Sequence, residues 1–179
     1  MKPESSVRKL LAGRDLRSIA RANDAVRLVS AHRSLFNSLL QDMWHTDARI
    51  CARAADAVEK VTRKQPELLE PFKKELLVLA AKTTQKGVQW HLAQIMPRLS
   101  LTQREWRRAV KIVREYLNSE SAIVRTSALQ ALFELSFGSR DLRRKVTALI
   151  TEKSKKGSPA ERARARKLLL AMEKDEASR

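Results

Sequence analysis

Cysteine, glycine and proline are all scarce in this sequence of 179 residues. The single cysteine, Cys51, excludes an intramolecular disulfide framework and leaves too little sulfur for a cysteine-based zinc site. Four glycines and five prolines exclude collagen-like and low-complexity chains, and they argue against an all-β sandwich with many tight turns. Apolar residues nevertheless make up 43% of the chain, which is enough for a sizeable core.

Long apolar runs and targeting signals are absent as well. No run approaches the roughly 18 apolar residues of a membrane span, and residues 76–81 are among the longest. The apolar part of the basic N-terminal segment is too short and too charged for a secretory signal peptide. We therefore expect a soluble, cytoplasmic protein that does not associate with membranes.

Motifs that carry enzymatic chemistry are also sparse. The three histidines, His32, His45 and His91, have no histidine or cysteine partner at the spacing of metal ligands. The sequence contains no nucleophile-elbow, Walker or dinucleotide-binding glycine motif. We therefore expect a non-enzymatic protein that uses neither a metal nor a cofactor.

A helical template recurs five times along the chain. It places apolar or small residues at offsets 0, 4, 7, 8 and 11, which share one face of a helix. The clearest copy consists of Val124, Ala128, Ala131, Leu132 and Leu135. The other copies begin at Ser18, Ile50, Val88 and Glu161, and further amphipathic segments lie between them. Two helices per period of about 36 residues predict an α-solenoid.

Capping signals mark where several of these helices should begin. Residues 102–105 and 158–161 both fit a capping box, and Asp47 can cap the helix that carries Ile50. Pro66 is suited to open the next helix, which we expect Pro71 to kink rather than end, because the apolar stripe continues past it.

These segments resemble a known family. Residues 123–135 (IVRTSALQALFEL) are similar to the second helix of a HEAT repeat, and residues 53–61 and 90–99 resemble those of short bacterial HEAT-repeat proteins. The resemblance implies an all-α, right-handed α-solenoid of about four to five helix pairs. HEAT arrays serve as scaffolds and transport adaptors and, less often, as DNA-repair enzymes.

The boundaries of the array follow from the extent of this resemblance. We expect a flexible N-terminal tail over residues 1–13, a single repeat array over 14–174 and a C-terminal tail over 175–179. We also expect the protein to be a monomer.

Positive charge is abundant and unevenly distributed. The chain has 37 Lys plus Arg against 20 Asp plus Glu, a net charge of +17. The excess lies in residues 1–33, 82–115 and 140–167, whereas residues 42–75 are neutral. Such a balance predicts an acidic partner, either a protein surface or a nucleic acid.

Candidate partner-binding residues follow from the resemblance, because the second helix of each HEAT pair lines the concave face. They are Arg17, Arg21, Arg49, Arg53, Trp90, His91, Arg125, Arg162, Arg164, Arg166 and Lys167. In the first two copies an aspartate follows an arginine at a spacing of three, which favours internal ion pairs. Trp90 can stack on a base or anchor a peptide, although core packing is the usual fate of tryptophan. The basic residues of segment 104–114 belong to a first helix, where they would keep the protein soluble.

Three functions are compatible with these features. The preferred interpretation is a scaffold that binds a protein partner of acidic character in its partly basic concave surface. The alternative is a protein that binds the backbone of a nucleic acid. The remote alternative is a HEAT-like DNA-alkylation glycosylase, for which Asp56 is the nearest candidate acid, although its recurrence as Asp24 argues for a structural role.

Overall fold

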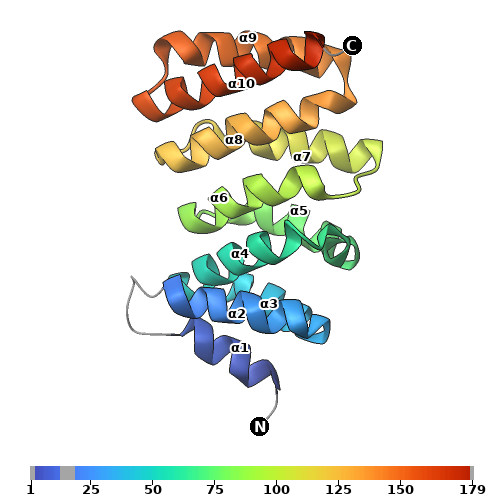
Figure 1. Cartoon of the computed structure of the whole chain (residues 1–179), viewed down its shortest axis with the longest axis vertical. Helices are drawn as coiled ribbons and strands as arrows, with labels where there is room; N and C mark the ends of the chain where they lie inside the picture. Colours follow the sequence, from blue (N-terminus) through green and yellow to red (C-terminus); the bar gives the residue numbers. More distant parts are fainter. Residues whose placement is uncertain (1–2, 13–18, 178–179) are drawn as a thin grey trace. The chain divides into compact units, whose positions relative to one another are not determined.

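The described part of the chain is entirely helical apart from its turns and short connections. The computed structural model describes the backbone of residues 3–12 and 19–177 and the side chains of residues 7–12 and 22–175. Within these ranges the chain forms ten α-helices and five short 3-10 helices and no strand (Figure 1). The predicted all-α class is therefore confirmed.

The chain divides into two compact units, Met1–Ser100 and Leu101–Arg179. The first unit contains α1 (Pro3–Leu11), α2 (Ile19–Ala31), η1 (Arg33–Leu35), α3 (Phe36–Gln41), η2 (Asp42–Trp44), α4 (Ala48–Thr62), η3 (Pro66–Phe72), α5 (Lys73–Lys82), α6 (Lys86–Ile95) and η4 (Met96–Arg98). The second unit contains α7 (Gln103–Tyr116), α8 (Ala122–Leu135), η5 (Ser136–Gly138), α9 (Arg140–Lys156) and α10 (Pro159–Ala177). The single array and its right-handed solenoid form stay predictions.

In the first unit, α4 is the central helix. It packs against α2 and α6, and α3 and η2 also contact it. All five template residues of α4 and all five of the copy that begins at Val88 are buried. The two helices approach closely, since a Cβ atom on Gly87 of α6 would lie only 3.0 Å from the Cβ of Ala52. Small residues therefore set the spacing between α4 and α6.

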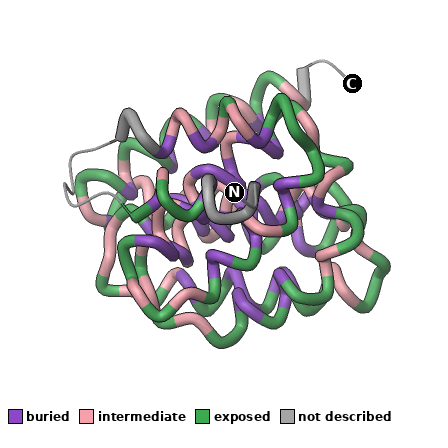
Figure 2. The backbone as a smooth tube through the Cα atoms, turned by 90° about the horizontal axis from the view of Figure 1, so that it is seen from below, coloured by how far each residue is buried: buried purple, intermediate pink, exposed green. Residues whose placement is uncertain are grey.

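In the second unit, α8 packs against both α7 and α10, and α9 packs along α10. The template residues of α8 are all buried, and Ala128 and Val124 are fully so. Buried and exposed residues alternate along the helices of both units, as Figure 2 shows, so each helix presents one apolar face to its neighbours. The template copies that begin at Ile50, Val88 and Val124 thus consist of core residues, whereas Val26 and Leu169 of the first and fifth copies are only half-buried.

The predicted capping signals are present. Thr102 and Glu105 form a reciprocal capping box at the start of α7, with the Thr102 N–H donating to Glu105 Oε2 at 2.9 Å. Ser158 and Glu161 bond in the same way at α10, with the Ser158 N–H donating to Glu161 Oε2 at 3.0 Å. Asp47 caps α4 by accepting the Arg49 N–H. These caps satisfy amide groups that the helix itself leaves free.

The predicted flexible tail over 1–13 is wrong, because Pro3–Leu11 forms α1. Val7 and Leu11, four residues apart and therefore on one helix face, are fully buried. Arg8 also binds Asp42, a buried carboxylate, with 2.7 Å between Nη2 and Oδ1. An apolar stripe of two residues and an ion pair with a distant aspartate thus help to dock a helix in the segment that we expected to be a tail.

Two other predicted boundaries also need correction. Asp175 and the following two residues belong to α10 rather than to a C-terminal tail, and Arg143 donates to the Asp175 carboxylate at 3.1 Å. The segment from Pro66 is not one kinked α-helix but a 3-10 helix, and α5 begins only at Lys73. Pro71 lies inside that 3-10 segment, where its missing N–H would interrupt an α-helix.

None of the helices in residues 3–12 and 19–177 combines the length and the apolar composition that a bilayer crossing requires.

Candidate functional site

The arginines predicted on α4 make internal contacts. Arg49 pairs with the capping residue Asp47 at 2.9 Å, and its hydrogen bonds hold the pKa of Asp47 down at about 2. Arg53 donates from Nη1 to the Leu11 carbonyl oxygen at 2.6 Å and so joins α4 to the end of α1. Both residues therefore contribute to the packing and capping of the first unit.

The candidates of the first template copy are only partly visible. Arg17 lies outside the described residues, as does the side chain of Arg21. Asp24, which follows Arg21 by three residues, forms an ion pair with Arg27 within α2. The charge of Asp24 is thus balanced inside its own helix, and the ion pair of Asp24 with Arg21 that the spacing favours stays a prediction.

His91 is a core residue, which contradicts its prediction as a partner-binding residue. His91 is buried, and this burial lowers its pKa while the nearby Asp56 carboxylate opposes that shift. The His91 ring stacks on the half-buried ring of Trp90, with 4.3 Å between ring centroids. Trp90 therefore packs on its neighbour in the chain.

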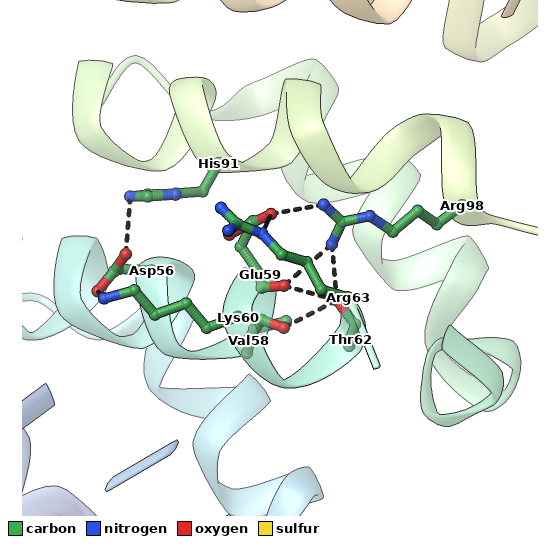
Figure 3. A network of polar contacts seen from close by, with 8 residues as sticks. All are labelled: Asp56, Val58, Glu59, Lys60, Thr62, Arg63, His91 and Arg98. Carbon is green, nitrogen blue, oxygen red and sulfur yellow. Dashed lines mark hydrogen bonds and ion pairs between the residues drawn. The ribbon is translucent and has the colours of Figure 1, made fainter. Parts of the chain in front are cut away.

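A buried carboxylate that the sequence did not single out lies between α4 and η4. Glu59 is 1% exposed and accepts hydrogen bonds from Arg63 Nε at 2.8 Å and Arg98 Nη2 at 2.5 Å (Figure 3). Burial raises the pKa of Glu59, but the bonds from the two arginines outweigh it and hold the pKa below its ordinary value. Arg98 also donates to the Glu59 carbonyl oxygen at 2.9 Å.

The same cluster extends across α4 toward α6. Asp56 binds Lys60 one turn further along α4 at 2.7 Å and faces His91, whose Nε2 lies 3.9 Å from Oδ1 (Figure 3). Asp56, the nearest candidate for a catalytic acid, is thus engaged in a structural ion pair. Among the described residues no group of three or more His, Cys, Asp or Glu side chains is arranged to hold a metal ion.

Arg125 on α8 is also bound internally. It donates from Nη1 to the carbonyl oxygens of Ser119 at 2.7 Å and Glu120 at 2.9 Å, and from Nη2 to Glu161 at 3.3 Å. Glu161 is buried; burial raises its pKa, but bonds from Ser158 and Arg125 lower it to about 2. Arg125 therefore ties α8, α10 and the loop after α7 together.

The basic candidates on α10 remain more accessible. Arg162 donates to the Gly157 carbonyl oxygen at 2.9 Å, and Arg164 donates to the Gln130 side chain at 3.2 Å. Arg164, Arg166 and Lys167 are exposed. In the described part of the chain Lys167 makes no hydrogen bond or ion pair. This group keeps cationic side chains available to solvent.

A row of exposed cations lies on α7, where the sequence suggested only a solubilising role. We call it the α7 row, and it consists of Arg104, Arg107, Arg108, Lys111 and Arg114. All five side chains are exposed, and across residues 7–12 and 22–175 none of them makes a hydrogen bond or ion pair. At about 100° per residue they cover an arc of roughly 120° on one side of the helix.

The opposite side of α7 carries its apolar residues, so the cations are confined to the side that faces solvent. Ala109 and Val113 are fully buried, and Ile112 and Tyr116 are nearly so. An open hollow of about 540 Å³ lies beside the row and is lined by Arg107, Val110, Lys111, Arg114, Glu115, Leu117 and Asn118. The packing of the second unit therefore directs five positive charges into solvent.

Comparison with known proteins adds no assignment to this geometry. No protein family, no curated protein and no solved structure matches the chain. Membership of the HEAT-repeat proteins, predicted from the residues, stays a prediction.

Proposed function

We propose that this protein is a non-enzymatic binding module whose second unit holds the phosphate backbone of a nucleic acid along α7. The observation that carries the proposal is the α7 row, whose five exposed cations have no partner among the residues that the structure describes. Phosphate contacts from lysine and arginine supply most of the affinity of sequence-independent nucleic-acid binding. The row offers such contacts without first having to break an internal bond.

The dimensions of the row suit a nucleic-acid backbone. From Arg104 to Arg114 the helix rises about 15 Å, at 1.5 Å per residue. A duplex presents one phosphate per strand for every 3.4 Å of its axis, so this length faces about four phosphates of one strand. Five cations in that span match the charge of the backbone segment.

The same row is poorly suited to a protein partner. Protein interfaces depend on apolar and aromatic anchors in a buried centre. The large apolar side chains that are exposed in the described residues are Trp44, Val78, Ile123, Phe137 and Leu170, and none of them lies on α7. A surface that offers charge without an anchor favours a polyanion.

A second candidate is the acidic protein partner, and one observation favours it on α10. Leu170 is 57% exposed and stands one turn after the exposed Arg166 and Lys167. An apolar anchor beside two cations is the arrangement that an acidic amphipathic segment recognises. Under this second candidate function, the protein partner would bind at α10 and not at α7.

The test compares two triple variants that remove the same charge. Arg104, Arg107 and Lys111 are changed to glutamine on α7, and Arg164, Arg166 and Lys167 are changed to glutamine on α10. Binding to mixed-sequence duplex DNA and to structured RNA is measured by fluorescence anisotropy at about 50 and 200 mM salt. Circular dichroism checks that both variants keep their helix content.

The proposal expects the α7 variant to lose most of its affinity and to reduce the salt slope by about 2 to 3, because each lost phosphate contact contributes about 0.9. The α10 variant should bind almost as the wild type does. Equal losses of affinity in the two variants would mean that binding depends on net charge and not on the α7 row. A wild-type protein that binds neither nucleic acid would refute the proposal and leave the α10 candidate.

A further inference from the structure

A second hollow lies in the second unit, where η5 leads into α9, and we call it the α9 hollow. It has a volume of about 480 Å³ and is lined by Ser136, Phe137, Ser139, Arg140, Arg143, Arg144, Thr147 and Ala148. That volume falls within the range of small-molecule sites. Its lining joins an exposed aromatic ring with three arginines.

The aromatic ring in this hollow is exposed yet fixed in position. Phe137 is 51% exposed, and its ring meets the Phe133 ring edge to face with 5.1 Å between centroids. The Arg143 guanidinium lies 4.4 Å from the centroid of Phe137, and its Nη2 donates to Asp175 at 3.1 Å. Arg143 thus holds the ring in place while part of the ring remains open to solvent.

Two further arginines line the same hollow. Arg140 is exposed and, in the part of the chain that the structure describes, makes no hydrogen bond or ion pair. Arg144 is exposed and shares Asp141 with Lys145, at 3.0 Å and 2.7 Å. Arginine matches the geometry of a phosphate with two parallel N–H bonds. A flat ring and two accessible guanidinium groups therefore lie in one hollow.

We propose that the α9 hollow binds a nucleotide that carries a terminal phosphate, with the base on Phe137 and the phosphate at Arg140 and Arg144. Aromatic side chains stack on bases of any sequence, and arginine supplies the counter-charge of a phosphate monoester. The nucleotide can be a free molecule or the 5′ end of a strand, since both present the same two groups. The strand-end form rests on the function proposed above.

The segment η5, which lines the α9 hollow, lies next to the start of α7. Trp106, which stands on α7 between Arg104 and Arg107, donates from Nε1 to the Leu135 carbonyl oxygen at 3.1 Å. A Cβ atom on Gly138 of η5 would lie 3.5 Å from the same Nε1. The start of α7 therefore packs against η5, whose residues line the α9 hollow.

The first experiment uses two oligonucleotides of one sequence, with and without a 5′ phosphate, both labelled at the 3′ end. Anisotropy with the full chain should show about tenfold tighter binding of the phosphorylated form, the usual effect of charged hydrogen bonds. Phe137→Leu and Arg140→Gln should bring the ratio of the two affinities close to 1. Arg104→Gln, the matched control on α7, should weaken both oligonucleotides equally and leave the ratio unchanged.

The second experiment separates the two sources by calorimetry with adenosine 5′-monophosphate, adenosine and inorganic phosphate. Binding of the monophosphate without a difference between the oligonucleotides identifies a free nucleotide, and the reverse result identifies a strand end. A ratio near 1 together with no monophosphate binding overturns the inference, as does inorganic phosphate that binds as tightly as the monophosphate. If neither oligonucleotide binds at all, the function proposed for α7 fails. The titration with the monophosphate then decides by itself whether the α9 hollow binds a nucleotide.

Discussion

The two units carry almost the same charges but place them differently. Met1–Ser100 has 18 basic and 10 acidic residues, and Leu101–Arg179 has 19 and 10. In the first unit the buried carboxylate of Glu59 binds both the exposed Arg63 and the half-buried Arg98. In the second unit the five cations of the α7 row face solvent without a partner among the described residues.

The difference shows that net charge alone does not identify a binding surface. A cation beside a buried carboxylate is held by that carboxylate, and moving it to a ligand would leave an uncompensated buried charge. A cation on the solvent side of α7 can bind a ligand without leaving a buried charge uncompensated. The contacts of each side chain therefore decide which part of the +17 net charge is available to a partner.

The largest effect on stability is expected when the buried carboxylate of Glu59 is removed. Glu59→Gln should destabilise the protein by about 3 kcal/mol, because Arg98 then loses its carboxylate in a largely buried place. Urea denaturation followed by circular dichroism measures the change. Asp141→Asn is the control, because its pairs with Arg144 and Lys145 are exposed. Equal shifts in the two variants would contradict the contrast between the units.

The next effect tests whether the two cores are equivalent. Ala54 on α4 and Ala128 on α8 are both fully buried at the same template offset. Replacing either with leucine should overpack its helix interface and cost about 1–3 kcal/mol. Ala163→Leu on α10, at an exposed position, should leave the denaturation midpoint nearly unchanged. A leucine that is tolerated at either buried site would refute the template register there.

The second unit also has a buried carboxylate, Glu161, which should make the stability of the protein depend on pH. Burial acts to raise its pKa, but bonds from Ser158 and Arg125 lower it from 4.5 to about 2 in the folded protein. Because the folded pKa is depressed, this group adds stability above pH 4.5 and loses that contribution as the pH falls toward 2. The stability difference between wild type and Glu161→Gln should therefore shrink over that range in urea titrations. A difference that stays constant down to pH 2 would contradict the prediction.

The smallest effect concerns the α7 row. Arg107→Gln and Lys111→Gln should each change the free energy of unfolding by less than about 0.5 kcal/mol, because neither side chain has a partner in the part of the chain that the structure describes. Thermal denaturation of the two variants beside Arg98→Gln provides the measurement and its contrast. A marked loss of stability on α7 would mean that the row has a structural role, and the proposed binding surface would then lose its main support.

Much of the fold was predictable because its signals are local. Val124, Ala128 and Leu135 recur with the helical period, and every template residue of α4 and α8 is buried. The capping boxes were equally readable, since Thr102 needs only Glu105, three residues further on. Helix α1 was missed because its three apolar residues, Val7, Leu10 and Leu11, are too few to mark a helix without the rest of the unit against which Val7 and Leu11 pack.

The contacts of the candidate site residues were harder to predict. Arginines chosen from the template, among them Arg53 and Arg125, bind carbonyl oxygens within their own units. The basic residues of α7 were visible as an i, i+3, i+4 pattern but were assigned to solubility. Nothing in the sequence around Glu59 indicates its importance, because its partner Arg98 is 39 residues away.

The sequence by itself determined the helical class, the apolar face of most helices, their caps and the excess of positive charge. These properties depend on neighbours within about one or two helical turns, so periodicity and composition are enough to reveal them. Only the tertiary structure decided which charges are neutralised and which remain free. Ion pairs such as that of Arg8 with Asp42 or Arg98 with Glu59 form between helices that packing brings together, and no local pattern records that distance.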